Sequence, residues 1–420
     1  MRTPTASRVG AILFLAVVCT ACGDYYRPVA NPVLPNQPNP NFSHVAVVVS
    51  DNGTNNDGAS TTIDVSGDSN VSQATVGLTP VHAAIVAAGT RVYVVNRMDD
   101  TVSEFPPTTP TPVITISLPV GSGPDFVHST EAANVYVANA GNNTVSSIST
   151  TTNVITNTAT VGTNPVSLAE MPNAQKIYVA NAGTNGTGGS VDSINTQNLT
   201  VNPPITPSGS APWVSPVWAV ARSDSQRIYI LDQGSGFVSA INTANDTVVG
   251  TASVGVGADY MVYDITLNRV YVTNPTVGTL TSLDASTDLL TAKTVSVPNA
   301  ISVAALLDGT RVYVSSATVS GSTVTSKVTV ITTNNLTVKT TIPLTSVPSA
   351  CSSHTWSELP VAAAADSSRI YVGNCDAGNI GIIQASNDTL LLEMKAPLSA
   401  KPPVNGTPPP QNPVFVVAGP

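Results

Sequence analysis

Residues 269–274 read RVYVTN, and close variants of this hexapeptide recur along the chain. RVYVVN stands at 91–96, NVYVAN at 134–139 and KIYVAN at 176–181. Runs of β-branched and aromatic residues such as these are typical of β-strands. The tyrosine of the hexapeptide marks seven copies: Tyr93, Tyr136, Tyr178, Tyr229, Tyr271, Tyr313 and Tyr371. The chain is therefore built from an internal repeat.

The spacing of these tyrosines predicts the architecture. Successive intervals are 43, 42, 51, 42, 42 and 58 residues. A β-rich repeat of about 40–45 residues is typical of one blade of a β-propeller. The copy that starts at Pro165 contains four strand-like segments, which read PVSLAEM, AQKIYVAN, GSVDSIN and LTVNPPI. An eighth copy, VVVSDNG from Val47, has Val48 in place of the tyrosine. We therefore expect an all-β fold of four-stranded antiparallel blades.

The two ends of the repeat region predict how the ring closes. The first copy begins at its second strand, and nothing before His44 is similar to PVSLAEM. The missing strand is found at residues 413–420, where PVFVVAGP aligns with PVSLAEMP. The C-terminal strand is thus expected to complete the first blade. Closure removes the exposed sheet edge that an open ring would leave.

The hexapeptide resembles the signature of the YVTN family of β-propellers, found in bacterial and archaeal surface and secreted proteins. The resemblance extends over residues 44–420 and implies one propeller domain, which in the family usually has seven blades. The eight second strands counted here favour eight blades, with seven as the alternative. The resemblance is specific for the fold and says little about function.

The N-terminus is similar to a bacterial lipoprotein signal peptide over residues 1–21. Two arginines precede the apolar stretch VGAILFLAVV, which is too short to span a bilayer. The resemblance implies lipidation of Cys22; the alternative is ordinary secretory cleavage near Ala21, which leaves Cys22 as a free thiol. Gly23 in the position where the inner-membrane retention signal has Asp favours the outer membrane. Residues 22–43 are rich in Pro and Asn and predict an extended tether.

Composition limits the classes of partner. Hydrophobic residues make up 42% of the chain and charged residues only 10%, which suits strands and tight turns. The formal net charge is −9, and no basic patch is visible, which argues against nucleic acid as a partner. We expect a monomer attached to the membrane through its lipid anchor.

The long loops are expected to gather on one face of the propeller. Blade-to-blade connections and the loops between second and third strands share a face, and two such connections, 203–216 and 343–360, are long. The predicted loops between second and third strands at 51–60, 182–190 and 315–326 are also long. Cys351 lies in the second of them, and Cys375 directly follows the strand RIYVGN. Because an exported chain permits disulfides, we expect these two cysteines to be bonded, with two free thiols as the alternative.

Residues suited to catalysis are sparse. The four histidines show no metal-ligand spacing, the five glutamates form no evident acid–base pair, and no G-x-S-x-G or C-x-x-C-H motif occurs. We therefore predict no catalytic residues, no bound metal and no cofactor. His82 and His128 are placed on the first strands of neighbouring blades, which line the central channel. They are candidate binding residues, with a role as polar channel residues as the alternative.

Aromatic residues supply the remaining candidates. Trp218 and Tyr260 fall at matching positions of their first strands, together with Phe126 and His82. Trp213 and Trp356 lie in the two long connections. Aromatic side chains beside a loop-rich face are suited to stacking on sugars or anchoring a protein. Packing between blades is the alternative.

These observations favour a non-catalytic, envelope-anchored lipoprotein that binds a protein or polysaccharide partner through its long loops. The alternative is a hydrolase similar to lactonase-type propellers, which act on sugar lactones. Such an enzyme needs His, Glu or Arg side chains that converge at the channel mouth. His82, His128, Glu170 and Arg222 are spread over four blades.

Overall fold

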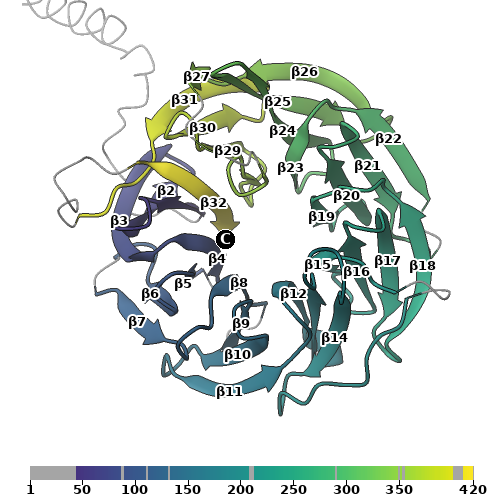
Figure 1. Cartoon of the computed structure of the whole chain (residues 1–420). Helices are drawn as coiled ribbons and strands as arrows, with labels where there is room; N and C mark the ends of the chain where they lie inside the picture. Colours follow the sequence, from purple (N-terminus) through teal and green to yellow (C-terminus); the bar gives the residue numbers. More distant parts are fainter. Residues whose placement is uncertain are drawn as a thin grey trace, which may run out of the picture.

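Eight antiparallel sheets stand around a central axis like the blades of a propeller (Figure 1). The computed structural model describes residues 44–86, 89–109, 112–130, 133–207, 212–288, 291–348, 351, 355–400 and 410–419. The predicted signal peptide (1–21), the lipidation site Cys22 and the tether (22–43) lie outside the described residues. The eight blades confirm the propeller and the preferred blade count, and the seven-bladed alternative is wrong.

The strands of each blade are given from the innermost outward. Blade one consists of β32 (Asn412–Gly419), β1 (Val45–Asp51), β2 (Asp57–Asp64) and β3 (Ser69–Leu78), and blade two of β4 (Pro80–Ile85), β5 (Val92–Asn96), β6 (Thr101–Phe105) and β7 (Ile114–Ser117). Blade three consists of β8 (Pro124–His128), β9 (Asn134–Asn139), β10 (Thr144–Ser149) and β11 (Ile155–Thr160), and blade four of β12 (Pro165–Met171), β13 (Lys176–Asn181) and β14 (Ser190–Asn195). A short 3₁₀ helix, η1 (Pro172–Ala174), joins β12 to β13.

Blade five consists of β15 (Pro216–Ala221), β16 (Arg227–Asp232), β17 (Phe237–Asn242) and β18 (Thr247–Ser253), and blade six of β19 (Tyr260–Asp264), β20 (Arg269–Asn274), β21 (Thr279–Asp284) and β22 (Ala292–Ser296). Blade seven consists of β23 (Ala300–Ala305), β24 (Arg311–Ser320), β25 (Thr323–Thr332), β26 (Thr337–Pro343) and the added strand β27 (Val347–Pro348). Blade eight consists of β28 (Val361–Ala363), β29 (Arg369–Asn374), β30 (Asn379–Gln384) and β31 (Thr389–Lys395).

Two details differ from the sequence-based expectation. The fourth strand predicted at LTVNPPI is wrong, because this edge of blade four has only an isolated bridge between Ile194 and Val201. Pro203 and Pro204 follow at once and have no N–H groups to extend the ladder. The loop predicted at 315–326 is instead a hairpin, in which β24 and β25 continue pairing to Ser320 and Thr323.

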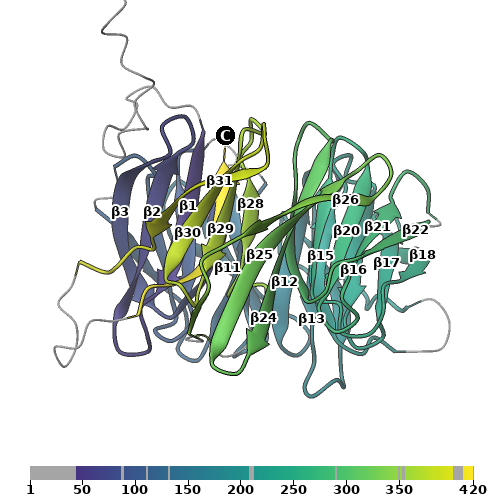
Figure 2. The ribbon, with the colours of Figure 1, turned by 90° about the horizontal axis from the view of Figure 1, so that it is seen from above.

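Closure by the C-terminal strand is confirmed. β32 pairs antiparallel with β1, from Val45 opposite Gly419 to Asp51 opposite Asn412. The first blade is thus made from both ends of the described chain, which lie together (Figures 1 and 2). Phe415 and Val416 of β32 are buried, so the closing strand also contributes side chains to the core.

In four of the repeats, the hydroxyl of the recurring tyrosine bonds to the next blade. All seven tyrosines are buried, and several hydroxyl groups reach the turn between the third and fourth strands of the following blade. Tyr178 and Lys176 both bond to Asp246, with Lys176 Nζ 2.9 Å from each carboxylate oxygen. Tyr93 donates to Asn153 Oδ1 at 3.0 Å. Residues of the R/K-x-Y pattern therefore form contacts between blades as well as part of a strand.

The same contact closes the ring between blades eight and one. Arg369 forms a forked ion pair with Asp68, with Nε–Oδ1 and Nη2–Oδ2 both at 2.8 Å. The Asp68 side chain is almost fully buried. Two parallel charge-assisted hydrogen bonds fix geometry better than a single contact does. The ring is thus closed by β32 within blade one and by this ion pair between blades eight and one.

Asp388 carries the most heavily bonded of these contacts. Its carboxylate accepts from Arg311 and Lys339 at 2.6 Å each and from the Tyr313 hydroxyl, and its side chain is 2% exposed. Burial raises the pKa of Asp388, but the hydrogen bonds from Lys339 and Tyr313 and the charge of Arg311 outweigh it, so this pKa lies below its ordinary value. We expect Asp388→Asn to lower the free energy of unfolding by about 3 kcal/mol at pH 7, because the largely buried Arg311 and the half-exposed Lys339 lose a buried counter-charge.

The stability difference between wild type and Asp388→Asn depends on pH, because folding lowers the pKa of Asp388. A carboxyl whose pKa is depressed by folding stabilises the fold above its unfolded pKa of about 4. That contribution disappears as the pH falls through the folded pKa, so the gap between wild type and variant should narrow below about pH 4. Urea unfolding at pH 7 and pH 3 measures this difference in the free energy of unfolding.

Asp288→Asn is the matched control, since Asp288 pairs with Arg227 but is 43% exposed. This substitution should lower the free energy of unfolding by less than about 1 kcal/mol. Equal losses in the two variants would contradict the prediction.

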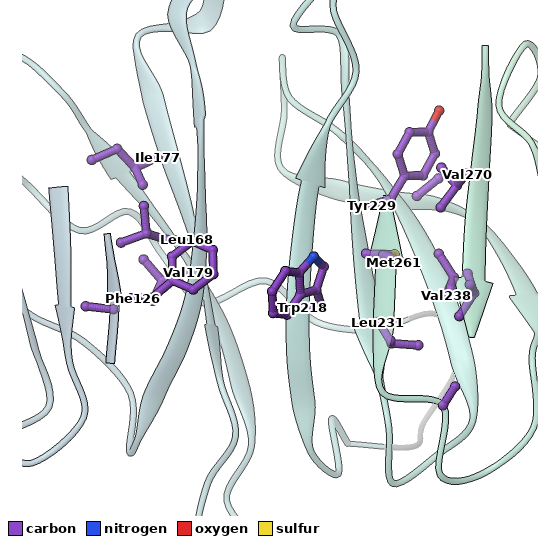
Figure 3. Packing of buried hydrophobic residues seen from close by; sticks show 14 of the residues in the cluster. Phe126, Leu168, Ile177, Val179, Trp218, Tyr229, Leu231, Val238, Met261 and Val270 are labelled. Atoms are coloured by element: carbon purple, nitrogen blue, oxygen red, sulfur yellow. The ribbon is translucent and has the colours of Figure 1, made fainter. Parts of the chain in front are cut away.

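The hydrophobic core consists of seams between adjacent blades. Figure 3 shows a cluster that extends over blades three to six: Leu168 of β12 and Val179 of β13 lie near Phe126 of β8, and Leu231 of β16 lies near Met261 of β19, with Trp218 of β15 between the two groups. Strands buried on both faces explain why the second strands read as nearly continuous apolar runs.

The two faces of the propeller differ. We call the loop face the end that carries the connections between blades and the loops between second and third strands, such as 182–189. The short-turn face is the opposite end, with turns such as 243–246. The described chain begins and ends at the short-turn face, since Val45 lies opposite Gly419 at the end of β32 (Figure 2).

Candidate functional site

A layer of aromatic rings crosses the central channel. It comprises one residue at the same position of five innermost strands together with one loop tryptophan: His82, Phe126, Trp218, Tyr260, Phe415 and Trp356. We call this group the aromatic layer. The remaining three blades have Ser167, Ser302 and Ala362 at that position, which leaves room for the loop tryptophan to enter.

The backbone directs these side chains to the axis. The ladder between first and second strands shifts register directly after the leading proline, between Pro80 and His82, between Pro124 and Phe126, and at the same place before Trp218. Such a β-bulge bends the strand and re-aims the side chain that follows it. The recurring Pro-x-aromatic pattern is therefore the local signal for the layer.

The rings contact one another closely. His82 lies 3.8 Å from Phe126 and 4.0 Å from Phe415 between ring centroids, and Trp218 lies 4.6 Å from Tyr260. Trp356 completes the layer, 5.0 Å from Trp218 in an edge-to-face arrangement. The two Trp218 distances fall in the range of about 4.5–7 Å that aromatic pairs favour, and the His82 ring lies closer to its neighbours than that. The layer separates two pockets in the channel, one on each side.

A disulfide holds the connection that carries Trp356. Cys351 is bonded to Cys375, which confirms the sequence prediction. The Cys351 N–H also donates to Asp376 at 2.9 Å, and β27 in the same connection pairs with β25. The backbone N–H of Trp356 donates to Asp259. The longest insertion of the chain is thus fixed at several points, and it delivers one indole to the channel.

The pocket on the loop-face side is small and polar at its rim. We call it the loop-face pocket; its volume is about 420 Å³, and Trp218 and Trp356 line it together with charged side chains. The charged residues are Asp51, Arg97, Asp125 and Asp259. Arg97 forms an ion pair with Asp125. Burial raises the pKa of both Asp51 and Asp259 and lowers the pKa of Arg97.

The pocket on the short-turn side is apolar. Its volume is about 440 Å³, and its lining includes Leu168, Met261 and Tyr263 beside His82 and His128. Burial lowers the pKa of His128 to about 4, and burial together with the nearby His128 lowers that of His82 well below its ordinary value. Both imidazoles are therefore expected to be neutral at pH 7, and no described carboxylate forms an ion pair with either of them.

Five of the six candidate binding residues lie in or beside the channel, and Trp213 does not. Trp213 is 5% exposed, packs in the seam between blades four and five, and donates from Nε1 to the Ile205 carbonyl at 2.9 Å. It therefore has the packing role that the sequence left open as the alternative. The sequence reading missed the carboxylates of the loop-face pocket. Asp125 and Asp259 stand directly before an aromatic-layer residue, which is the signal that would have found them.

The side chains considered for lactone chemistry do not converge. Glu170 accepts from the N–H and the hydroxyl of Thr130 at 2.8 and 2.7 Å. Arg222 is paired with Asp224 at 2.9 Å. Within the described part of the chain, no group of three or more His, Cys, Asp or Glu side chains is placed to hold a metal ion. No described helix is long and apolar enough to cross a membrane.

The fold defines the class of protein: an eight-bladed β-propeller whose channel is crossed by aromatic side chains. The chain matches no protein-family model and no curated protein, so the YVTN assignment stays a prediction from the repeat residues.

Solved propellers are similar in structure. Apo AztD from Citrobacter koseri superimposes with a TM-score of 0.63 at 12% identity, over 90% of this chain and 98% of that one. The dihydro-heme d1 dehydrogenase NirN gives 0.61 at 11% identity, over 91% and 77%. A putative 6-phosphogluconolactonase from Bacteroides fragilis gives 0.54 at 14% identity, over 91% and 99%. At these identities the likeness concerns the fold alone, and the functions of the neighbours differ.

Proposed function

We propose that this chain is an exported, non-catalytic β-propeller of the YVTN type, anchored by a lipid at Cys22 in the outer membrane, which binds an envelope partner through its loop face. The observation that carries the proposal is the loop face itself, which combines a pocket lined by Trp218 and Trp356 with exposed apolar side chains. Half of the twelve exposed large hydrophobic side chains of the described chain lie on this face: Met98, Val120, Phe237, Val256, Val277 and Val319. Val120 is 97% exposed. Aromatic side chains that line a pocket on a loop-bearing face are suited to anchoring a partner.

The path of the chain supports this orientation. The described chain begins at the short-turn face, so an anchor attached through residues 22–43 would hold that face toward the membrane. The loop face then points away from the membrane and is free to meet a partner. Binding residues carried on loops of a rigid scaffold fit this arrangement.

The alternative function, hydrolysis of a sugar lactone, has less support. Glu170 and Arg222 are engaged in local hydrogen bonds, and His82 lies within the aromatic layer. The likeness to a putative lactonase is one of fold. Lactone hydrolysis by the purified protein, abolished by a change at His82 or His128, would favour the enzyme instead.

Crosslinking in native envelopes tests the proposal. A crosslinker attached near the loop face should join one partner to wild type. A variant in which the six loop-face side chains are replaced by Ser should lose at least about 90% of that product, because the apolar contacts supply most of the binding energy. The matched control replaces Val154, Ile265 and Leu307, exposed apolar residues of the short-turn face, by Ser and should keep the product. Loss in the control alone would place the interface on the other face and overturn the proposal.

A further inference from the structure

The loop-face pocket has an unbalanced charge. Among the described residues, three carboxylates and one guanidinium line it, so the acidic groups exceed the basic ones by two. Arg97 is already paired with Asp125. Asp51 accepts from the Gly53 N–H and Asp259 from Gln233 Nε2, each at 3.0 Å, but within the described part of the chain neither has an ion-pair partner. Two partly desolvated carboxylates therefore face the pocket, and no described residue supplies them with a counter-ion.

The walls of the pocket add a second feature. Trp218 and Trp356 both line it, and Trp356 is tied to Asp259 through its backbone N–H. The face of an indole attracts a cation through its quadrupole, and the attraction is greatest where water is displaced. Carboxylates at the rim and indoles at the floor thus favour the same kind of guest, a positively charged organic group.

The net charge of the whole chain has the same sign as the charge of the loop-face pocket. The net charge of −9 attracts cationic partners and repels anionic ones over several ångströms. A phosphate or a uronic acid would meet uncompensated carboxylates in the pocket. A volume of about 420 Å³ is ample for one lysine or arginine side chain.

We propose that the loop-face pocket binds a basic side chain of the protein partner, held between the Asp51 and Asp259 carboxylates and the indoles of Trp218 and Trp356. This inference rests on the proposed function, since it assigns the partner's anchoring residue. It also selects a protein over a polysaccharide as the partner.

Tryptophan fluorescence tests the pocket without the partner. The chain has three tryptophans, two of which line the pocket. Titration of the folded protein with N-acetyl-lysine methylamide or N-acetyl-arginine methylamide should give a saturable change. The uncharged analogue N-acetyl-norleucine methylamide should give none. Raising the salt from 50 to 500 mM should weaken binding at least about threefold, because the attraction is electrostatic.

Variants separate the pocket from the rest of the surface. Asp259→Asn and Asp51→Asn keep the side-chain shape and should each weaken binding about fivefold, the size of one cation contact. Asp308→Asn, at an exposed turn of the short-turn face, is the control and should leave binding unchanged. Circular dichroism confirms that each variant is folded.

The possible outcomes are distinct. A saturable response to maltotriose but not to the cationic probes would overturn the inference in favour of a saccharide site. The absence of any response to the cationic probes would also overturn it, yet the crosslinked partner would still support the proposed function. A cation response without a crosslinked partner would leave the pocket assigned and contradict the proposed function.

Discussion

Deletion of residues 412–420 is expected to lower the free energy of unfolding by more than about 5 kcal/mol, which is enough to unfold many domains. The deletion removes β32, whose backbone pairs with β1 along its whole length. It also removes Phe415, which packs against His82 in the aromatic layer. The β1 edge would then be open, and an exposed central strand pairs with other chains.

Two controls make this result specific. Phe415→Ala removes the ring but keeps the strand, so it should cost about 3 kcal/mol and leave the oligomeric state of the protein unchanged. A synthetic peptide spanning residues 410–420, added to the truncated protein, should restore part of the lost stability by adding itself to the β1 edge. Thermal unfolding followed by circular dichroism measures all three. A truncated chain that melts within a few degrees of wild type, with no response to the peptide, would show that closure does not stabilise the ring.

The repeat made the architecture predictable. A period near 42 residues, apolar second strands and a displaced copy of the first strand at 413–420 are each visible in the sequence. Together they specify the blade count and the closing strand, because each blade is one supersecondary unit that buries its faces against its neighbours. The Cys351–Cys375 bond was predictable for the same reason, since the register of blade eight places both cysteines at the loop face.

Features outside the repeat were not predictable in this way. Trp356 lies in an insertion with no counterpart in the other blades, so its entry into the channel depends on the three-dimensional path of the connection. Trp213 lies in the other long connection and is buried between blades instead. In the sequence Trp356 and Trp213 cannot be told apart, because each is a tryptophan in a Pro- and Ser-rich segment. The register shifts after the leading prolines are likewise visible only in the ladder, although one of them lies at Asp125 of the loop-face pocket.

Trp218→Ala is expected to cost about 4 kcal/mol, the usual range for removing a buried tryptophan. The side chain is 6% exposed and contacts three other rings of the aromatic layer within 5.4 Å between centroids: Phe126, Tyr260 and Trp356. Removing it leaves a cavity at the centre of the layer, where the main chains of rigid blades cannot approach to fill it. Urea unfolding with tyrosine absorbance or circular dichroism as the signal measures the loss.

Trp218→Phe separates packing from any special role of the indole. Phenylalanine keeps an aromatic ring at the same place, so the loss should fall to about 1.5 kcal/mol, while the weaker quadrupole of the smaller ring should still reduce binding of a cationic probe. Phe237→Ala is the surface control, since Phe237 is 42% exposed and its removal should cost under about 1 kcal/mol. If Trp218→Ala were as mild as this control, the aromatic layer would not be a packed part of the core. Its rings would then be held in place by the eight blades alone, and the separation of the channel into two pockets would have to come from the disulfide-bonded connection that carries Trp356.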